Sequence, residues 1–259
     1  MKKIAFVTLF PDWIRESLGQ SMMARAEASG AVEFSVVNPR SFCYDSHRKV
    51  DDIPYGGHPG MLMKAEPVAL AIESKLRAQG SGIRYETGAL SVSSSPSLAE
   101  GVARDEPGEE KIAIVITEPS GAKFEQLQAE ELAEFDQIIF VCGHYEGIDH
   151  RIEETFATHV FSIGDYVLTN GELPALVMAD AVVRLLPGVL GNQDSLDEES
   201  FQNNLLGAPN YTRPEIWREK AIPEVLKSGN HAQIDKWRNA QSLERTKKRR
   251  PDLLDKKDS

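Results

Sequence analysis

The sequence predicts an α/β fold built on a mostly parallel sheet, followed by a small helical domain. Short apolar segments rich in β-branched residues alternate along the chain with segments of helical periodicity, which is the pattern of βαβ units. From Thr212 onward the chain carries helical patterns, with Trp217, Trp237 and Leu243 as apolar anchors. A chain of 259 residues can bury a sizeable core around such a sheet.

The N-terminal part is expected to supply two strands and two helices. Residues 4–9 form an apolar run that ends at a Phe-Pro pair, as a buried strand would, and residues 32–37 alternate like a second strand. Residues 13–28 and 65–77 have the apolar spacing of helices. The polar, glycine-rich residues 44–60 are expected to form a loop between them.

The middle of the chain continues the alternation after a polar interruption. Residues 78–110 are rich in Ser, Gly and Glu, so we expect an exposed insertion there. Residues 191–204 are polar as well and are expected to form a linker. The predicted strands are residues 111–116, 137–142 and 159–163, and the predicted helices are residues 124–135, 149–155 and 173–186.

The composition argues against several classes of protein. The two cysteines, Cys43 and Cys142, have no CxxC partner, so neither a disulfide framework nor a zinc site is expected, and a reducing compartment fits their usage. The N-terminal apolar run stops at Pro11, before it reaches signal-peptide length. No stretch approaches the roughly 20 apolar residues of a membrane span. We therefore expect a cytoplasmic protein that does not enter a membrane.

The charge is distributed unevenly along an acidic chain. The net charge of −11 does not by itself indicate nucleic-acid binding. Residues 231–250, however, contain a basic cluster that would suit local contact with phosphates. A solvated helix end is the alternative interpretation. The cations of this cluster are Lys236, Arg238, Arg245, Lys247, Lys248, Arg249 and Arg250.

Three loops are predicted at the carboxyl ends of neighbouring strands, at residues 117–124, 142–149 and 164–175. Ligands of parallel sheets bind beyond these strand ends, and glycines there let the backbone approach a ligand closely. Neither a GxGxxG after the first strand nor a GxxxxGK[ST] is present. Each loop alone could be a tight turn, but three in series, with Tyr145 and Glu146 embedded in them, predict a cofactor pocket.

Charged residues outside these loops offer fewer candidates. Arg184 lies in an otherwise apolar helical segment, so its guanidinium either binds an anion, such as a substrate oxygen, or reaches the surface. The acidic residues of the linker keep it solvated, and composition singles out none of them as a base. The histidines of the polar loops lack metal-ligand spacing, so no metal site is assigned.

The sequence contains several long motifs in a fixed order. On them the sequence resembles the bacterial tRNA (guanine-N1)-methyltransferases, the TrmD family of the knotted SPOUT superfamily. The resemblance spans nearly the whole chain and omits only the insertion at about 78–110. The motifs are SFCYDSHRKVDDIPYGGHPGMLM (41–63), VCGHYEGIDHRI (141–152), SIGDYVLTNGELPA (162–175), RLLPGVLGNQDS (184–195), YTRPEIW (211–217), PEVLKSGNHAQIDKWR (223–238) and SLERTKKRRPDLL (242–254).

The resemblance implies a SPOUT-type parallel sheet with a deep trefoil knot, an exception to the rule that chains do not thread loops. It implies a knotted methyltransferase domain at residues 1–189, an interdomain linker at 190–206 and a small helical tRNA-binding domain at 207–259. It also implies tRNA as the partner and a homodimer with each active site at the subunit interface.

The activity that the resemblance implies is transfer of a methyl group from S-adenosylmethionine to N1 of the guanosine on the 3′ side of the anticodon. This nitrogen carries a proton, so a carboxylate base is needed, and a cation would stabilise the charge that builds on O6. By position, Glu199 is the base and Arg184 the catalytic arginine. The family has an aspartate where Glu199 stands, so Asp197 and Asp194 remain alternatives. The resemblance also implies Mg²⁺.

Binding residues follow from the same matching of positions. Glu146 is implied to hold the guanine edge, and Tyr145 borders the same pocket. The sequence departs from the family at His58 and Asn170, where glycine is usual, and at Glu118, in a run that replaces Tyr-Leu-Ser. The residues implied to contact the cofactor are Pro119, Gly143, Ile163, Gly164, Asp165, Tyr166, Val167, Leu168, Gly171 and Pro174.

Two alternative functions compete with this one. A different knotted methyltransferase would modify ribosomal RNA or a ribose oxygen, but it would not need a guanine-edge glutamate such as Glu146. A non-enzymatic RNA-binding relative could have lost its base, but the retained Arg184 and cofactor loops argue against such decay. The identity of the methylated nucleoside distinguishes the first alternative, and a single-turnover assay distinguishes the second.

Overall fold

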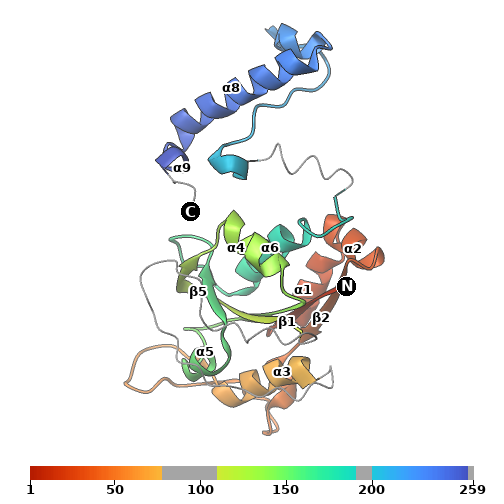
Figure 1. Cartoon of the computed structure of the whole chain (residues 1–259). Helices are drawn as coiled ribbons and strands as arrows, with labels where there is room; N and C mark the ends of the chain where they lie inside the picture. The colour runs from red at the N-terminus through yellow and green to blue at the C-terminus, as the bar shows by residue number, and fades with distance from the viewer. Residues whose placement is uncertain (78–109, 191–199, 256–259) are drawn as a thin grey trace. The chain divides into compact units, whose positions relative to one another are not determined.

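The computed structural model describes residues 1–77, 110–190 and 200–255, and the chain divides into two compact units (Figure 1). The first unit is Met1–Leu190 and the second is Gly191–Ser259. All but the last residue of the predicted insertion lie outside the described residues, and so do residues 191–199 of the predicted linker, with the candidate base Glu199 and its alternatives Asp197 and Asp194.

A five-stranded sheet forms the centre of the first unit, and all of its strand pairs are parallel. The strand order is β2-β1-β6-β5-β7, so the chain crosses over between non-neighbouring strands. The prediction of a parallel α/β sheet is therefore confirmed. The strands are β1 (Lys2–Val7), β2 (Val32–Val37), β5 (Ile112–Lys123), β6 (Gln137–Cys142) and β7 (His159–Ser162).

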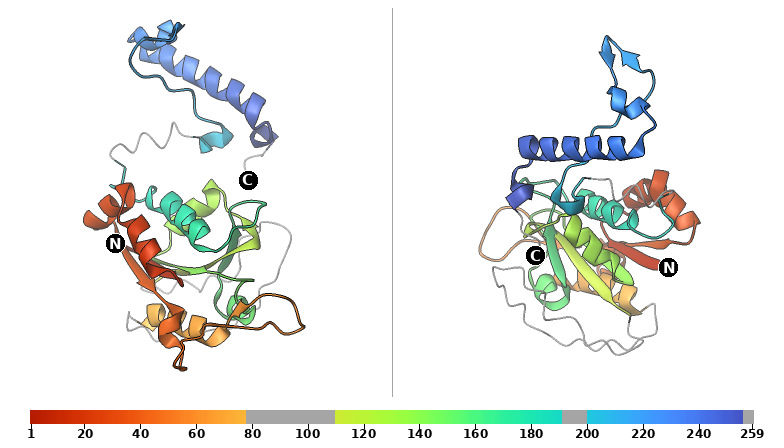
Figure 2. Two further views of the ribbon diagram at one scale, coloured as in Figure 1. Left: turned by 180° about the vertical axis from the view of Figure 1, so that it is seen from behind. Right: turned by 45° about the horizontal axis from the view of Figure 1, so that its top comes forward.

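Helices cover both faces of this sheet, as two views show (Figures 1 and 2). Successive strand side chains point to opposite faces, so Phe6 and Phe140 stack in one core with ring centroids 5.4 Å apart, whereas Ala5 and Val141 pack in the other. None of the described helices is long and apolar enough to cross a membrane. One face carries α1 (Pro11–Leu18), α2 (Ser21–Ala28), α4 (Gln126–Ala133) and α6 (Glu172–Val183); the other carries α3 (Ala65–Arg77) and α5 (Arg151–Phe156).

Two expected elements differ in the structure. The single helix expected at residues 13–28 is divided into α1 and α2, because α1 ends at Gly19 and Ser21 has a left-handed φ of 49°. The loop expected at residues 44–60 contains the short strand β3 (Asp51–Asp52), which pairs antiparallel with β4 (Leu62–Met63).

The predicted loop at residues 117–124 lies largely inside β5. This strand pairs with β7 on both sides of an irregularity, since Thr117 and Ala122 both face Phe161. The intervening residues form a bulge, which suits Pro119 because proline has no N–H for the sheet ladder. At Gly121 a Cβ would lie 2.7 Å from the backbone N of Phe161, so the strand returns to the sheet through a glycine. The sequence pattern missed this continuation because the bulge is polar.

The second unit is built around one long helix. Asn230 caps α8 (His231–Arg249) by accepting a hydrogen bond from Gln233 N at 3.2 Å. Thr246 of α8 is buried and accepts a hydrogen bond from Leu206 N at 2.9 Å, which attaches the start of the unit to the helix. The remaining elements are η2 (Gln202–Asn204), β8 (Ile216–Trp217), β9 (Lys220–Ala221), η3 (Glu224–Lys227) and α9 (Asp252–Asp255).

Candidate functional site

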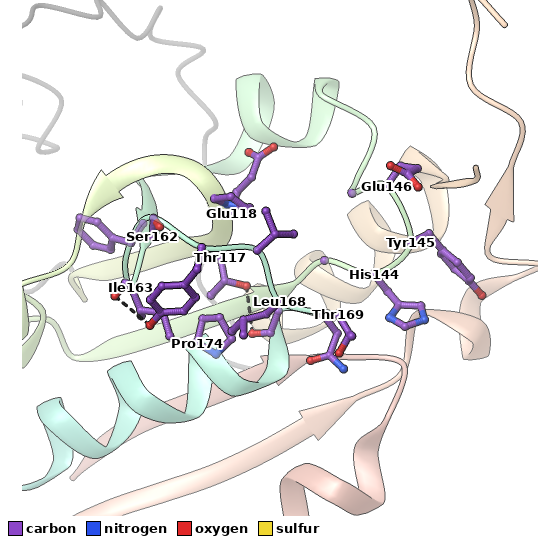
Figure 3. A pocket seen from close by; sticks show the side chains of 18 residues that line it. Thr117, Glu118, His144, Tyr145, Glu146, Ser162, Ile163, Leu168, Thr169 and Pro174 are labelled. Atoms are coloured by element: carbon purple, nitrogen blue, oxygen red, sulfur yellow. Dashed lines mark hydrogen bonds between the residues drawn. The ribbon is translucent and has the colours of Figure 1, made fainter. Parts of the chain in front are cut away.

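A pocket lies at the carboxyl ends of β5, β6 and β7, where parallel sheets bind ligands (Figure 3). All three predicted loop segments contribute to its wall. Ile163, Leu168 and Pro174 gather on one side, whereas Tyr145 and Glu146 lie on the other. The lining residues are Thr117, Glu118, Pro119, Gly143, His144, Tyr145, Glu146, Gly147, Phe161, Ser162, Ile163, Tyr166, Val167, Leu168, Thr169, Asn170, Gly171 and Pro174.

The structure brings most of the predicted binding residues together. Gly164 and Asp165 belong to the same segment but do not line the pocket; Gly164, with a φ of 151°, forms its turn and accepts a hydrogen bond from Tyr166 N at 2.8 Å. Arg184 does not line the pocket either. The predicted residues that do are Pro119, Gly143, Tyr145, Glu146, Ile163, Tyr166, Val167, Leu168, Gly171 and Pro174.

Gly171 and Thr117 join the three segments into one wall. Gly171 N donates to Gly143 O at 2.8 Å, and Thr117 Oγ1 donates to Gly171 O at 3.1 Å. A Cβ on Gly171 would lie 2.7 Å from the backbone N of Gly143 and would also overlap Thr117 Oγ1. Only glycine therefore fits at this crossing. Thr117 was not predicted, because a threonine at the end of a strand has no distinctive pattern.

A second set of backbone contacts fixes Tyr145 and Glu146 at the mouth of the pocket. Glu146 N donates to Met61 O at 3.0 Å, and Met63 N donates to Gly147 O at 3.0 Å. Gly60 has a φ of 101°, and a side chain there would overlap that of Glu146. The segment before β4 thus supports the loop after β6, although Gly60 does not itself line the pocket.

Both side chains at the mouth are open to solvent. Tyr145 is 41% exposed, and its hydroxyl accepts a hydrogen bond from Arg40 Nη2 at 3.3 Å. Its backbone has a left-handed φ of 61°, which is uncommon for a non-glycine residue and typical of functional turns. An aromatic ring and a carboxylate at an open mouth suit a flat polar ring that arrives from outside, such as a nucleobase.

The wall of the pocket also carries an acidic pair. Glu118 lies on the β5 bulge and interacts with Glu153 of α5. Burial, followed by the negative charge of Glu118, raises the pKa of Glu153 above its usual value. A carboxylate in a pocket wall favours a ligand that carries positive charge. The described residues include no group of three or more His, Cys, Asp or Glu side chains that could hold a metal ion.

A buried carboxyl group lies directly behind the pocket. Glu172, the first residue of α6, is fully buried, and its Oε1 accepts a hydrogen bond from Thr8 Oγ1 at 2.6 Å. Burial raises the pKa of Glu172, and the Thr8 hydroxyl partly opposes that shift. Burial also raises the pKa of the Cys142 thiol, and the charge of Glu172 adds to the effect.

This raised pKa predicts how stability depends on pH. The folded state binds the Glu172 proton more tightly than the unfolded chain, whose carboxyl has the usual pKa of 4.5. The resulting stabilisation is present below that pH and is lost as the pH rises through the folded pKa. The free energy of unfolding of the wild type, minus that of Glu172→Gln, should therefore fall in urea titrations as the pH rises above about 4.5. A difference that stays constant would contradict the raised pKa.

Comparisons with known proteins agree on one family. Residues 1–91 and 98–256 match the family described as tRNA (Guanine-1)-methyltransferase TrmD. The chain is 46% identical over 252 residues to a tRNA (guanine-N(1)-)-methyltransferase of Bacillus velezensis, covering 97% of this chain and 92% of the relative. A protein of the same name from Bacillus subtilis is 44% identical, and the match covers 97% of this chain and 92% of that relative. Another from Lachnoclostridium phytofermentans is 43% identical, and the match covers 96% of this chain and 90% of that relative. The matched residues include the parallel sheet and the pocket at its edge, and the chain belongs to the tRNA (guanine-N1)-methyltransferase family.

Proposed function

We propose that this protein transfers a methyl group from S-adenosylmethionine to N1 of the guanosine on the 3′ side of the anticodon of tRNA. The observation that carries the proposal is the pocket at the ends of β5, β6 and β7, whose lining includes most of the positions implied for cofactor and guanine in a chain of this family. Its mouth is lined by Tyr145 and Glu146, which suit a nucleobase, and its wall by Glu118, which suits a cationic ligand.

The residues of the pocket fit S-adenosylmethionine. Gly143 lines the pocket without a side chain, so a ligand can approach its backbone closely. Ile163, Leu168 and Pro174 offer an apolar surface on the same side for a ring system. When bound, this cofactor supplies an electrophilic methyl group on a sulfonium. The protein then mainly has to hold the nucleophile in line with that methyl group.

The chain's own charged residues prepare the nucleophile. The Glu146 carboxylate accepts hydrogen bonds from the guanine edge, while Glu199 removes the proton from N1. The guanidinium of Arg184 stabilises the negative charge that develops on O6. For Mg²⁺ the described residues offer no fitting cluster, so no step is assigned to it.

The position of Arg184 supports a homodimer. Gly171 and Arg184 lie at opposite ends of α6, about 20 Å apart at a rise of about 1.5 Å per residue. A single side chain does not cover that distance, so Arg184 would act in the pocket of a second copy. Leu173 and Val177, four residues apart on α6, are 43% and 50% exposed. This apolar stripe suits the packing of α6 against the partner subunit.

The remaining parts of the proposal concern the organisation of the chain. We assign residues 1–189 to a methyltransferase domain with a deep trefoil knot, 190–206 to the linker and 207–259 to a helical tRNA-binding domain. The assignment of a knot rests on the family to which the chain belongs. A basic last turn of α8 and an exposed Trp217, with Arg218 4.8 Å from its ring centre, suit RNA binding.

Two free thiols and a tRNA substrate support a cytoplasmic location.

Replacing Glu199 with glutamine tests both the reaction and its base. With labelled S-adenosylmethionine and a tRNA transcript, the wild type should yield N1-methylguanosine. The variant should still bind tRNA but transfer methyl groups about 100-fold more slowly, because an amide cannot take the N1 proton. Asp197→Asn and Asp194→Asn serve as matched controls and should retain the wild-type rate.

The possible outcomes separate the enzyme assignment from the base assignment. Full activity in Glu199→Gln with a loss in one of the aspartate variants would move the base to that aspartate. A different methylated nucleoside would replace the proposed target with that of another knotted methyltransferase. A wild type that forms no methylated product in a single-turnover assay would contradict the proposed activity itself.

A further inference from the structure

Buried polar atoms without a hydrogen-bond partner gather at the pocket: Nδ1 of His144 and Oδ1 of Asn170 belong to its lining residues, and Oε2 belongs to Glu172, which follows the lining residue Gly171 in the chain. Oε2 of Glu172 and Nδ1 of His144 are both buried, and neither has a hydrogen-bond partner among the described residues. The two side chains nonetheless interact electrostatically. The residues that precede them, Gly171 and Gly143, are joined by a backbone hydrogen bond of 2.8 Å, so Glu172 and His144 are neighbours across the pocket wall. Buried polar atoms in native proteins are nearly always hydrogen-bonded, so two neighbouring residues with unpaired buried atoms call for a functional explanation.

The carboxyl group of Glu172 is held in a fixed position. Its Oε1 accepts from Thr8 Oγ1 at 2.6 Å, and Thr8 Oγ1 in turn accepts from Phe10 N at 2.9 Å. This chain of hydrogen bonds attaches α6 to the end of β1. Because Oε1 is committed to Thr8, Oε2 remains the available acceptor of a carboxyl that solvent does not reach.

The imidazole of His144 is the other half of the pair. Its ring contacts the rings of Phe10 and Tyr145, with centroids 5.1 Å and 4.4 Å away. His144 lines the pocket, and Tyr145 and Glu146 directly follow it in the chain. Any hydrogen bond that fixes His144 therefore also fixes the backbone from which these two side chains reach the mouth.

We propose that Glu172 is a positioning residue that acts through His144. When the pocket is occupied, Nδ1–H of His144 donates a hydrogen bond to Oε2 of Glu172. This bond holds Tyr145 and Glu146 in the orientation that receives the target base. Glu172 does not line the pocket and touches neither ligand, so its effect falls on the tRNA side of the reaction. The proposal rests on the proposed function, because the affected residues are those assigned to guanine.

A kinetic comparison tests the proposal. Glu172→Gln keeps the shape of the side chain but removes the carboxylate, and His144→Gln removes the imidazole while Glu172 stays in place. Each variant should raise KM for tRNA about tenfold or more, while the dissociation constant of S-adenosylhomocysteine changes less than about threefold. The double variant should be no worse than the poorer single one, because both remove the same hydrogen bond. Asp180→Asn, an exposed acid on the same helix, is the matched control.

Nitrogen NMR provides a readout that a merely structural role would not change. The chain has six histidines, so labelled histidine gives few signals, and His144→Gln identifies the relevant one. With S-adenosylhomocysteine bound, Nδ1 of His144 should be protonated in the wild type and should lose that signature in Glu172→Gln. An unprotonated Nδ1 in the wild-type complex, additive kinetic effects or an unchanged KM for tRNA would overturn the proposal. A wild type that binds S-adenosylhomocysteine but does not methylate tRNA would instead refute the proposed function.

Discussion

Gly171→Ala is expected to reduce methyl transfer more than 100-fold while the protein remains folded. The added Cβ would lie 2.7 Å from Gly143 N and would overlap Thr117 Oγ1, so at least one of the three segments of the pocket wall has to move. Displacing reacting groups by about 1 Å can cost about 100-fold in rate. Both the affinity for S-adenosylmethionine and the turnover number should fall, since the crossing shapes the wall and also precedes the helix of Arg184.

Calorimetric titration with S-adenosylhomocysteine and a methyl-transfer assay check this expectation. Gly19→Ala is the matched control: this glycine ends α1 at an ordinary φ of −72°, and its nearest neighbour would be Arg15 O at 3.3 Å. That variant should behave like the wild type in both measurements. Wild-type cofactor affinity in Gly171→Ala would mean that the three segments can separate without loss of the site.

Arg184→Ala should lose about 100- to 1,000-fold in turnover number, the usual effect of removing a group that stabilises developing negative charge. The affinity for S-adenosylhomocysteine should change little, because Arg184 does not line the pocket of its own chain. The same variant can also show which pocket Arg184 serves. A heterodimer of Arg184→Ala with Gly171→Val combines one intact pocket with one intact arginine, carried by different subunits.

The two arrangements predict opposite results for this heterodimer. If Arg184 acts in the partner's pocket, the intact pocket receives the intact arginine, and about half of the wild-type rate should return. If it acts within its own chain, both sites are defective and the heterodimer stays inactive. Co-expression with two affinity tags yields the mixed species, and the two homodimers, both expected to be inactive, are the controls. A monomeric wild type in light scattering would contradict the homodimer directly.

The parallel sheet and the location of its pocket could be predicted from local sequence alone. Apolar runs alternate with helical spacing, and carboxyl ends of parallel strands meet at one edge, so glycines after three strands had to come together. What could not be predicted depends on contacts between distant segments. Thr117 gained its role only through Gly171, which follows it by 54 residues. The close approach of Gly60 to Glu146 likewise joins residues that no periodicity relates.

The division of the first long helix was missed for a different reason. Apolar spacing continues through Gly19 and Ser21, so the periodic signal does not register the left-handed φ of 49° at Ser21. The buried position of Glu172 was equally invisible, because a glutamate that follows a glycine at a helix start has the pattern of an ordinary exposed first turn. At Glu172 a tertiary contact with Thr8 overrode that local preference.

The irregular strand β5 has a consequence for how this pocket can diversify. Its bulge lies between two points that pair with the same residue of β7, since Thr117 and Ala122 both face Phe161. Exchanging one side chain for another within the bulge, for example at Glu118, leaves this pairing intact. Because the bulge leaves the ladder at Thr117 and rejoins it at Ala122, a residue added within it would lengthen the wall without changing the register of either flank. Both the side chains and the length of this wall can therefore change while the pairing of β5 with β7 is kept.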